Sequence, residues 1–139
     1  MLNKALDKTV LLSTMWIFVT INYIYCDVFT LFYSEDLKNF LAGKVGDVVI
    51  DQNFLLTFSI ILEIPILMIL LSRILNHKLN RIVNICAGCI LTLVQAGTLF
   101  GGSQTKHYIF FSIIEISTTI LIAWIALKWK SVEVEKNHN

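Results

Sequence analysis

The stretch FLLTFSIILEIPILMILLS, residues 54–72, decides the fold of this chain. It holds a single charged side chain, Glu63, and its apolar residues run on continuously instead of alternating with polar ones. A helix needs about 20 mostly apolar residues to cross the hydrocarbon core of a membrane. A strand of a membrane barrel would alternate with a period of two. Residues 54–72 therefore predict a transmembrane helix.

Three further runs have the same character: residues 10–33, 82–100 and 108–127. Together the four runs hold only three of the 21 charged residues. The 139 residues are 56% hydrophobic and 15% charged, with a mean hydropathy of +0.73, whereas soluble domains average about 25% charged residues. This composition excludes an ordinary soluble domain. The net charge of +1, without a basic cluster, gives no indication of nucleic-acid binding.

The expected fold is all-α, a transmembrane four-helix bundle with up-down topology. It forms a single membrane domain over residues 1–139 and ends in a polar tail, residues 128–139. The connections 73–81 and 101–107 are short, which makes the second, third and fourth spans antiparallel neighbours.

The first connection, residues 34–53, is longer and carries helix signals of its own. Ser34 is a good N-cap, Leu37 and Phe40 share a helical face, and Gly43 suits a helix end. We expect a short interfacial helix between spans one and two. An ordered loop is the alternative.

Lysine and arginine positions predict the orientation of the bundle. Eight of the eleven basic residues fall in the N-terminal segment, the connection 73–81 and the tail, and three fall in the other two connections. Cytoplasmic loops carry the excess of basic residues in membrane proteins. We therefore expect a multi-pass protein of the plasma membrane with both termini in the cytoplasm.

Three acidic residues, Asp27, Glu63 and Glu115, lie inside the predicted spans. A charge at the centre of a membrane helix costs about 2.5–3.5 kcal/mol or more. At about 1.5 Å per residue, these acids lie roughly 9–13 Å below the outer ends of their spans, and Gln95 lies roughly 8 Å below. Tyr23 precedes Asp27 by one helical turn on the same face. These five residues predict a polar pocket in the outer half of the membrane.

No lysine or arginine lies within the four spans to neutralise these acids. The acids must then be protonated or bind a cation, which predicts a protein that binds or passes a small cation, an amine or a proton, with a role in transport. Pro65 favours this interpretation, because it removes the amide that would bond to the Ile61 carbonyl and kinks the helix beside Glu63. The alternative is a structural or accessory subunit whose protonated carboxyls only join the helices by hydrogen bonds.

Cys86 and Cys89 form a C-x-x-C pattern, the spacing of thiol redox sites and of half a metal site. They lie near the cytoplasmic end of their span, where a disulfide is disfavoured, and free cysteine is a common core residue. A membrane thiol oxidoreductase, or another membrane enzyme, remains a further alternative. Familiar catalytic and nucleotide-binding motifs do not occur, so we predict no cofactor and no metal site.

Aromatic residues lie near the ends of the spans, as in the aromatic belts of membrane interfaces. We assign an anchoring role to Trp16, Trp124, Trp129, Tyr33, Phe54 and Tyr108. Gly97 and Gly101 form a G-x-x-x-G pattern on a ridge of small residues that begins at Gly88. Such a ridge permits close approach of helices. It predicts packing within the bundle, or a homodimer through Gly97 and Gly101.

Two stretches carry a resemblance to a known family. The first is LSTMWIFV at residues 12–19, which continues to Asn22, Tyr23 and Asp27, and the second is EIPI at residues 63–66, followed by LLSR at 70–73. They resemble a family of small, four-span prokaryotic integral membrane proteins of unknown function. The resemblance covers nearly the whole chain. It implies a membrane bundle and no particular activity.

Overall fold

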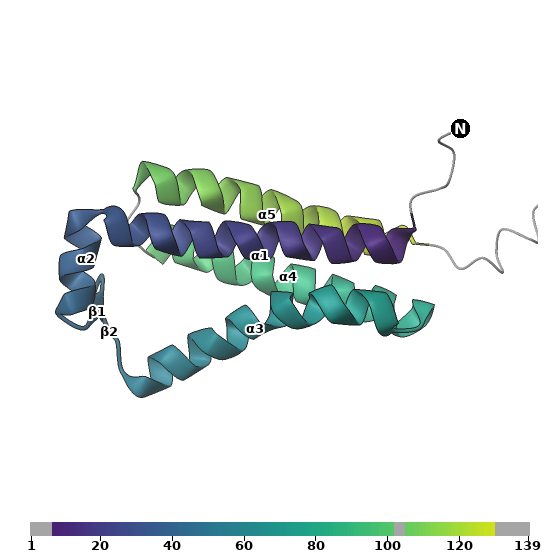
Figure 1. Ribbon diagram of the computed structural model, residues 1–139, viewed down its shortest axis with the longest axis horizontal. Helices are drawn as coiled ribbons and strands as arrows, with labels where there is room; N and C mark the ends of the chain where they lie inside the picture. Colours follow the sequence, from purple (N-terminus) through teal and green to yellow (C-terminus); the bar gives the residue numbers. More distant parts are fainter. Residues whose placement is uncertain (1–6, 102–104, 130–139) are drawn as a thin grey trace, which may run out of the picture.

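The computed structural model describes residues 7–101 and 105–129, which form four long helices, α1 (Lys8–Phe32), α3 (Gln52–Ile74), α4 (His77–Gly101) and α5 (Lys106–Leu127) (Figure 1). Each of the four is long and apolar enough to cross a membrane. The predicted all-α fold and its four spans are confirmed. Lys4 and the part of the predicted tail from residue 130 onward lie outside the described residues.

The four helices pack around a common axis, each antiparallel to its two neighbours. Helix α1 packs against α3 and α5, and α4 packs against the same two helices (Figure 1). Each helix begins a few residues before its predicted span, in charged or polar sequence, because backbone hydrogen bonds continue where the apolar run stops, whereas α1 ends at Phe32 and α5 at Leu127. Most large apolar side chains point outward. An outward apolar surface is what a helix bundle presents to lipid.

The buried core lies toward the ends of the bundle where α1 begins and α5 ends. It consists of Leu12, Trp16, Val19, Met68, Ala87, Leu91 and Ile122. Trp16 is 0% exposed, and its indole Nε1 donates a 2.7 Å hydrogen bond to Oδ1 of Asn84. The anchoring role predicted for Trp16 is therefore wrong. Its ring fills the core because it lies on the inward face of α1.

A buried polar network surrounds that indole. The amide of Asn84 accepts from Trp16 and from Ser72 Oγ (3.3 Å) and donates to Asn80 Oδ1 (2.7 Å). Asn80 in turn donates to the Ser72 carbonyl (2.8 Å). Nearby, Arg81 donates to the carbonyls of Ala126 and Leu127 and so satisfies the end of α5. These bonds join α1, α3, α4 and α5 at one end of the bundle.

Helix α3 changes direction near its middle, and its first half slants away from the other helices (Figure 1). Pro65 lies in the middle of α3 and is buried. Proline lacks the amide proton of the helical ladder and its ring clashes with the preceding turn, so it kinks a helix. The predicted kink at Pro65 is observed, and it separates a packed second half of α3 from an exposed first half.

A short helix, α2 (Ser34–Leu41), follows α1 as predicted, with Tyr33 rather than Ser34 at its N-cap. It leads to a hairpin of two short strands, β1 (Lys44–Val45) and β2 (Val48–Val49), which the sequence did not predict. The hairpin turns at Gly46, whose φ of 56° suits the first position of a two-residue turn and favours glycine. Gly43, with a φ of 72°, ends the α2 segment.

Two aspartates fix the starts of the long helices. Asp7 accepts from the backbone N–H of Thr9 (3.0 Å) at the start of α1, and Asp51 accepts from the N–H of Phe54 (2.7 Å) at the start of α3. Such N-caps satisfy amides that have no partner within the helix. The backbone bond from Thr9, and then the bond from its hydroxyl, lower the pKa of Asp7 below its ordinary value.

Candidate functional site

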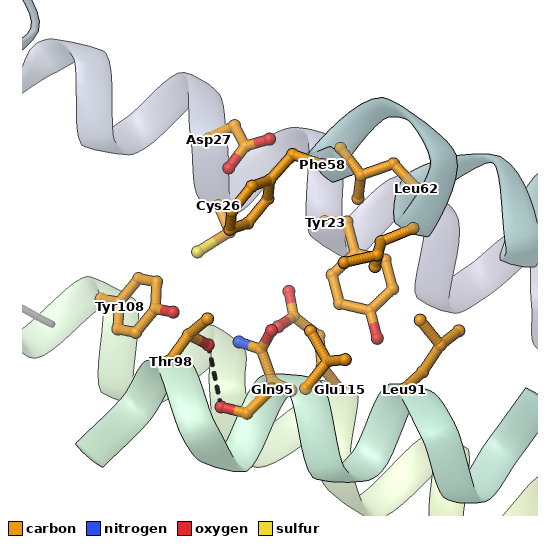
Figure 2. A pocket seen from close by; sticks show the side chains of 12 residues that line it. Tyr23, Cys26, Asp27, Phe58, Leu62, Leu91, Gln95, Thr98, Tyr108 and Glu115 are labelled. Atoms are coloured by element: carbon orange, nitrogen blue, oxygen red, sulfur yellow. Dashed lines mark hydrogen bonds between the residues drawn. The ribbon is translucent and has the colours of Figure 1, made fainter. Parts of the chain in front are cut away.

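A pocket of about 110 Å³ lies between the four long helices in the half of the bundle that faces α2 (Figure 2). All four helices contribute to it. Its lining consists of Tyr23, Cys26 and Asp27 from α1, Phe58, Ile61 and Leu62 from α3, Leu91, Val94, Gln95 and Thr98 from α4, and Tyr108 and Glu115 from α5. This pocket, called the acidic pocket below, brings together four of the five predicted site residues: Tyr23, Asp27, Gln95 and Glu115.

Contacts between α4 and α5 fix the direction of Glu115. Ser112, Glu115 and Thr119 follow one another at helical spacing on α5, and each is 0% exposed. On either side of Glu115, Gln95 Nε2 donates to Ser112 Oγ (2.9 Å), and the hydroxyls of Thr92 and Thr119 lie 2.8 Å apart. The two bonds hold this face of α5 against α4. Glu115 is thereby directed to the inside of the bundle (Figure 2).

Helices α4 and α5 also approach each other closely at Gly88, one turn before Thr92 on α4. At Gly88 of α4, a Cβ atom would lie 2.9 Å from the carbonyl oxygen of Thr119 and 3.1 Å from Cβ of Ala123. Only glycine allows the two backbones to come this near. The predicted packing role of the small-residue ridge therefore falls on Gly88.

The carboxyl group of Glu115 has an unusual environment. Both of its oxygens are buried, and neither has a hydrogen-bond partner within residues 7–101 and 105–129. The hydroxyl of Tyr23 is also buried and without a partner in the same part of the chain. Among the described residues, no lysine, arginine or histidine lines the pocket. Buried polar groups in proteins almost always have partners, so these two groups require an explanation.

Asp27 occupies a different position from Glu115. Its side chain is exposed and lies at the edge of the pocket, whereas Cys26 beside it is buried and directs its sulfur inward (Figure 2). The pocket therefore has one carboxyl at its base and another at its edge.

Glu63, the fifth predicted site residue, lies apart from the others. Its side chain is exposed on α3 and does not line the acidic pocket. Phe58, Ile61 and Leu62 are the residues that α3 directs to the pocket instead. In the sequence of this span, Ser59 lies one helical turn before Glu63 and these two residues alone form its polar face. Two residues do not fix the rotation of a helix about its axis.

The sequence interpretation missed the apolar lining residues, among them Phe58. Thr98 and Tyr108 belong to polar helical faces that the sequence predicts to line the pocket, and both do line it, although Tyr108 was also given an anchoring role. Phe58 carries no comparable signal, since it is one apolar residue among many in its span.

Cys86 and Cys89 are free thiols on the exposed surface of α4, outside the acidic pocket. The described residues contain no group of three or more histidine, cysteine, aspartate or glutamate side chains that could hold a metal ion. The pair therefore has no further ligand within this part of the chain. A redox role for the two thiols stays an untested alternative.

Two glycines of α4, Gly88 and Gly97, lie in different environments. Gly97 is exposed, and a Cβ atom there would meet nothing within 4 Å, in contrast to Gly88. Gly97 therefore contributes no close contact inside the bundle. A homodimer through Gly97 and Gly101 stays a prediction.

A second, shallow hollow lies between α2 and the start of α5. It is lined by Tyr33, Glu35, Asp36, Asn39, Thr105, Lys106 and His107. The hydroxyl of Tyr33 donates to Oε2 of Glu35 (3.0 Å), and this bond raises the pKa of the tyrosine. His107 Nε2 lies 3.3 Å from the hydroxyl of Thr30, which links α5 to the end of α1. These polar contacts lie where α2, the end of α1 and the start of α5 meet.

Comparison with known proteins places the chain in a family. Residues 2–136 match a family that is described only as a family of unknown function, DUF6326. The comparisons with curated proteins and with solved structures found no significant match. The match agrees with the resemblance that residues 12–19 and 63–66 indicated. Since it covers nearly the whole sequence, this membrane-type helical bundle belongs to the DUF6326 family of unknown function.

Proposed function

We propose that this protein binds or passes a small cation, an amine or a proton in the acidic pocket between its four membrane-spanning helices. One observation carries the proposal: Glu115 is 0% exposed, and both of its carboxyl oxygens lack a partner among the described residues. A buried carboxylate is costly unless it is paired or takes up a proton. A bound cation or a transferable proton meets this requirement.

The other polar groups of the pocket support the same proposal. Asp27 adds a second carboxyl at the edge, and the unpartnered hydroxyl of Tyr23 can donate to a carboxylate or accept from a bound ammonium group. Gln95 is held in place by its bond to Ser112. Its carbonyl oxygen adds a neutral acceptor. The pocket thus offers hydrogen-bond acceptors to a positively charged ligand. Among the described residues, no basic side chain lines the pocket and competes with the ligand for these acceptors.

The proposed location is the plasma membrane, with both termini in the cytoplasm and the acidic pocket in the outer half of the bilayer. The excess of lysine and arginine at the two termini and in the connection 73–81 supports this orientation. A reporter fused after Asn139 should report the cytoplasm, and one inserted within residues 44–51 should report the exterior. The reverse result at either position would overturn the orientation.

The function is tested by thermal unfolding of the purified full chain in detergent, over a range of pH and with a panel of inorganic and organic cations. A species that binds only the folded protein raises its apparent stability by mass action. We expect wild type to respond to pH or to a cation, and Glu115→Gln to lose that response. Glutamine keeps the shape of the side chain and removes its charge.

Glu63→Gln is the matched control, because Glu63 is also a glutamate in the middle of a spanning helix but is exposed outside the pocket. This variant should respond as wild type does. If wild type responds to neither pH nor any cation, or if Glu115→Gln and Glu63→Gln behave alike, the pocket is not a binding site.

A further inference from the structure

We propose that the ligand of the acidic pocket is a hydrophobic organic amine, bound as its ammonium ion with the nitrogen at Glu115 and the hydrocarbon group against Phe58 and Tyr108. This inference rests on the proposed function and narrows it to one class of ligand. It follows from the contrast between the base of the pocket and its walls.

The base of the pocket provides a binding position for one positive nitrogen. Glu115 offers two buried acceptor oxygens without partners in the described part of the chain. An ammonium group carries several N–H donors and forms charge-assisted hydrogen bonds with a carboxylate. The Tyr23 hydroxyl, likewise buried and unpartnered within residues 7–101 and 105–129, adds a third polar contact.

These oxygens do not suit a hard metal cation. Calcium takes six to eight oxygen ligands, and magnesium requires a nearly regular octahedron. Besides Glu115, Asp27 is the only carboxyl that the described residues bring to the pocket, and its side chain lies at the edge rather than at the base. An ammonium ion needs only a few acceptors, which is the number that the base provides.

The walls of the pocket are mostly apolar or aromatic. They include the rings of Tyr23, Phe58 and Tyr108 and the side chains of Ile61, Leu62, Leu91 and Val94, and Cys26, Gln95 and Thr98 complete them (Figure 2). Aromatic faces attract organic cations, and aliphatic side chains accept a hydrocarbon group. A strongly hydrated inorganic ion would gain nothing from these walls. A ligand with one charged end and one apolar end matches both parts of the pocket.

The first half of α3 is the side from which we expect such a ligand to enter. Its residues Leu55, Leu56 and Ile60 are 55%, 60% and 61% exposed, and this half slants away from α4 (Figure 1). An amphiphilic amine partitions into the bilayer and would reach the pocket from that side. The volume of about 110 Å³ is smaller than the roughly 150 Å³ of an engineered cavity that binds benzene, so the buried group is no larger than a single ring.

The test is thermal unfolding of the full chain in detergent at neutral pH and constant ionic strength, with four probes: benzylammonium, methylammonium, benzyl alcohol and sodium chloride. Benzylammonium should raise the melting temperature in a saturable manner. Methylammonium lacks the hydrocarbon group, benzyl alcohol lacks the charge, and both should bind at least about tenfold more weakly. Sodium chloride should have no specific effect.

Variants separate the two ends of the pocket. Glu115→Gln should weaken binding of benzylammonium by about tenfold or more, as expected for the loss of a charge-assisted hydrogen bond. Phe58→Ala should weaken benzylammonium and leave methylammonium unchanged. Phe110→Ala is its control, because Phe110 is 60% exposed on α5 and does not line the pocket.

The outcomes distinguish this inference from the proposed function. If only protons or inorganic cations stabilise the protein, the pocket is a cation site and the amine assignment is overturned. If benzyl alcohol binds as well as benzylammonium, the pocket is a neutral apolar site and the assignment is again overturned. If no probe and no pH change has an effect, both proposals fail. Should Glu115→Gln fail to fold, two other comparisons test the amine assignment. One compares benzylammonium with benzyl alcohol on wild type, and the other compares benzylammonium binding to Phe58→Ala and to Phe110→Ala.

Discussion

Replacing Gly88 by alanine tests whether the α4–α5 contact holds Glu115 in its buried position. The added Cβ would lie 2.9 Å from a backbone oxygen, that of Thr119, and 3.1 Å from Cβ of Ala123. A backbone atom of a packed helix cannot move alone, so the two helices must separate by a few tenths of an ångström. The separation also lengthens the neighbouring contact between Thr92 and Thr119, now 2.8 Å.

Two opposing effects set the magnitude. Overpacking a close contact costs typically about 1–3 kcal/mol, and weakening an interhelical hydrogen bond in a membrane protein costs about 0.6 kcal/mol more. Alanine gains up to about 1 kcal/mol over glycine as a helix former. We therefore expect Gly88→Ala to lower the free energy of unfolding by about 1–2 kcal/mol.

Gly97→Ala on the same helix is the matched control. A Cβ at Gly97 meets nothing within 4 Å, so only the gain in helix propensity acts, and the free energy of unfolding should stay the same or rise by up to about 1 kcal/mol. Both variants can be measured by equilibrium unfolding in mixed micelles, followed by circular dichroism. If Gly88→Ala is as stable as Gly97→Ala, the close approach of α4 and α5 is not what positions Glu115.

Three further predictions concern other parts of the molecule. Asn84→Ala should lower the free energy of unfolding by about 1–3 kcal/mol, because it leaves buried polar groups without partners, whereas alanine at the exposed Asn53 should change it little in the same unfolding assay. The capping contribution of Asp7, whose pKa is lowered from 3.8, is present above the unfolded-state pKa of about 3.9 and is lost as the pH falls through the lower folded-state value. Helix stability measured from neutral to acid pH should therefore fall in wild type through a step that Asp7→Asn lacks. Joint replacement of the exposed Cys86 and Cys89 by alanine should leave membrane level and melting temperature nearly unchanged; loss of an activity at normal expression would instead favour the redox alternative.

Hydropathy predicted the four long helices because a backbone in lipid must satisfy its own hydrogen bonds, and a helix does so within one segment. Ser34, Leu37, Phe40 and Gly43 together predicted a short helix after α1, with an ordered loop as the alternative, and α2 is that helix. The hairpin at residues 44–49 was missed because strands of two residues are too short to show an alternating pattern. The helices could therefore be predicted from the residues within each segment, whereas the two-residue strands could not.

The candidate site was predicted only where a helical face carried three or more polar residues. Tyr23 and Glu115 belong to such faces, and both line the pocket. Glu63 does not, and the bend at Pro65 changes the direction of the half of α3 that carries it. Asn80 and Asn84 were missed because polar residues at the end of an apolar span look like part of a connection, although both are 0% exposed.

Two of the buried polar residues of the bundle, Asn84 and Glu115, differ in a way that bears on function. Asn84 and Glu115 are both fully buried, but the amide of Asn84 bonds to Trp16, Ser72 and Asn80, while neither oxygen of Glu115 has a partner in the described residues. A polar residue that serves only to join helices stabilises the bundle through such bonds, as Asn84 does. Glu115 makes no such bond within the described residues, although Ser112, one turn before it on α5, accepts a hydrogen bond from Gln95 of α4. The role of a structural contact therefore fits Asn84 and leaves Glu115 unexplained, which favours a ligand or a proton as the partner of its carboxyl group.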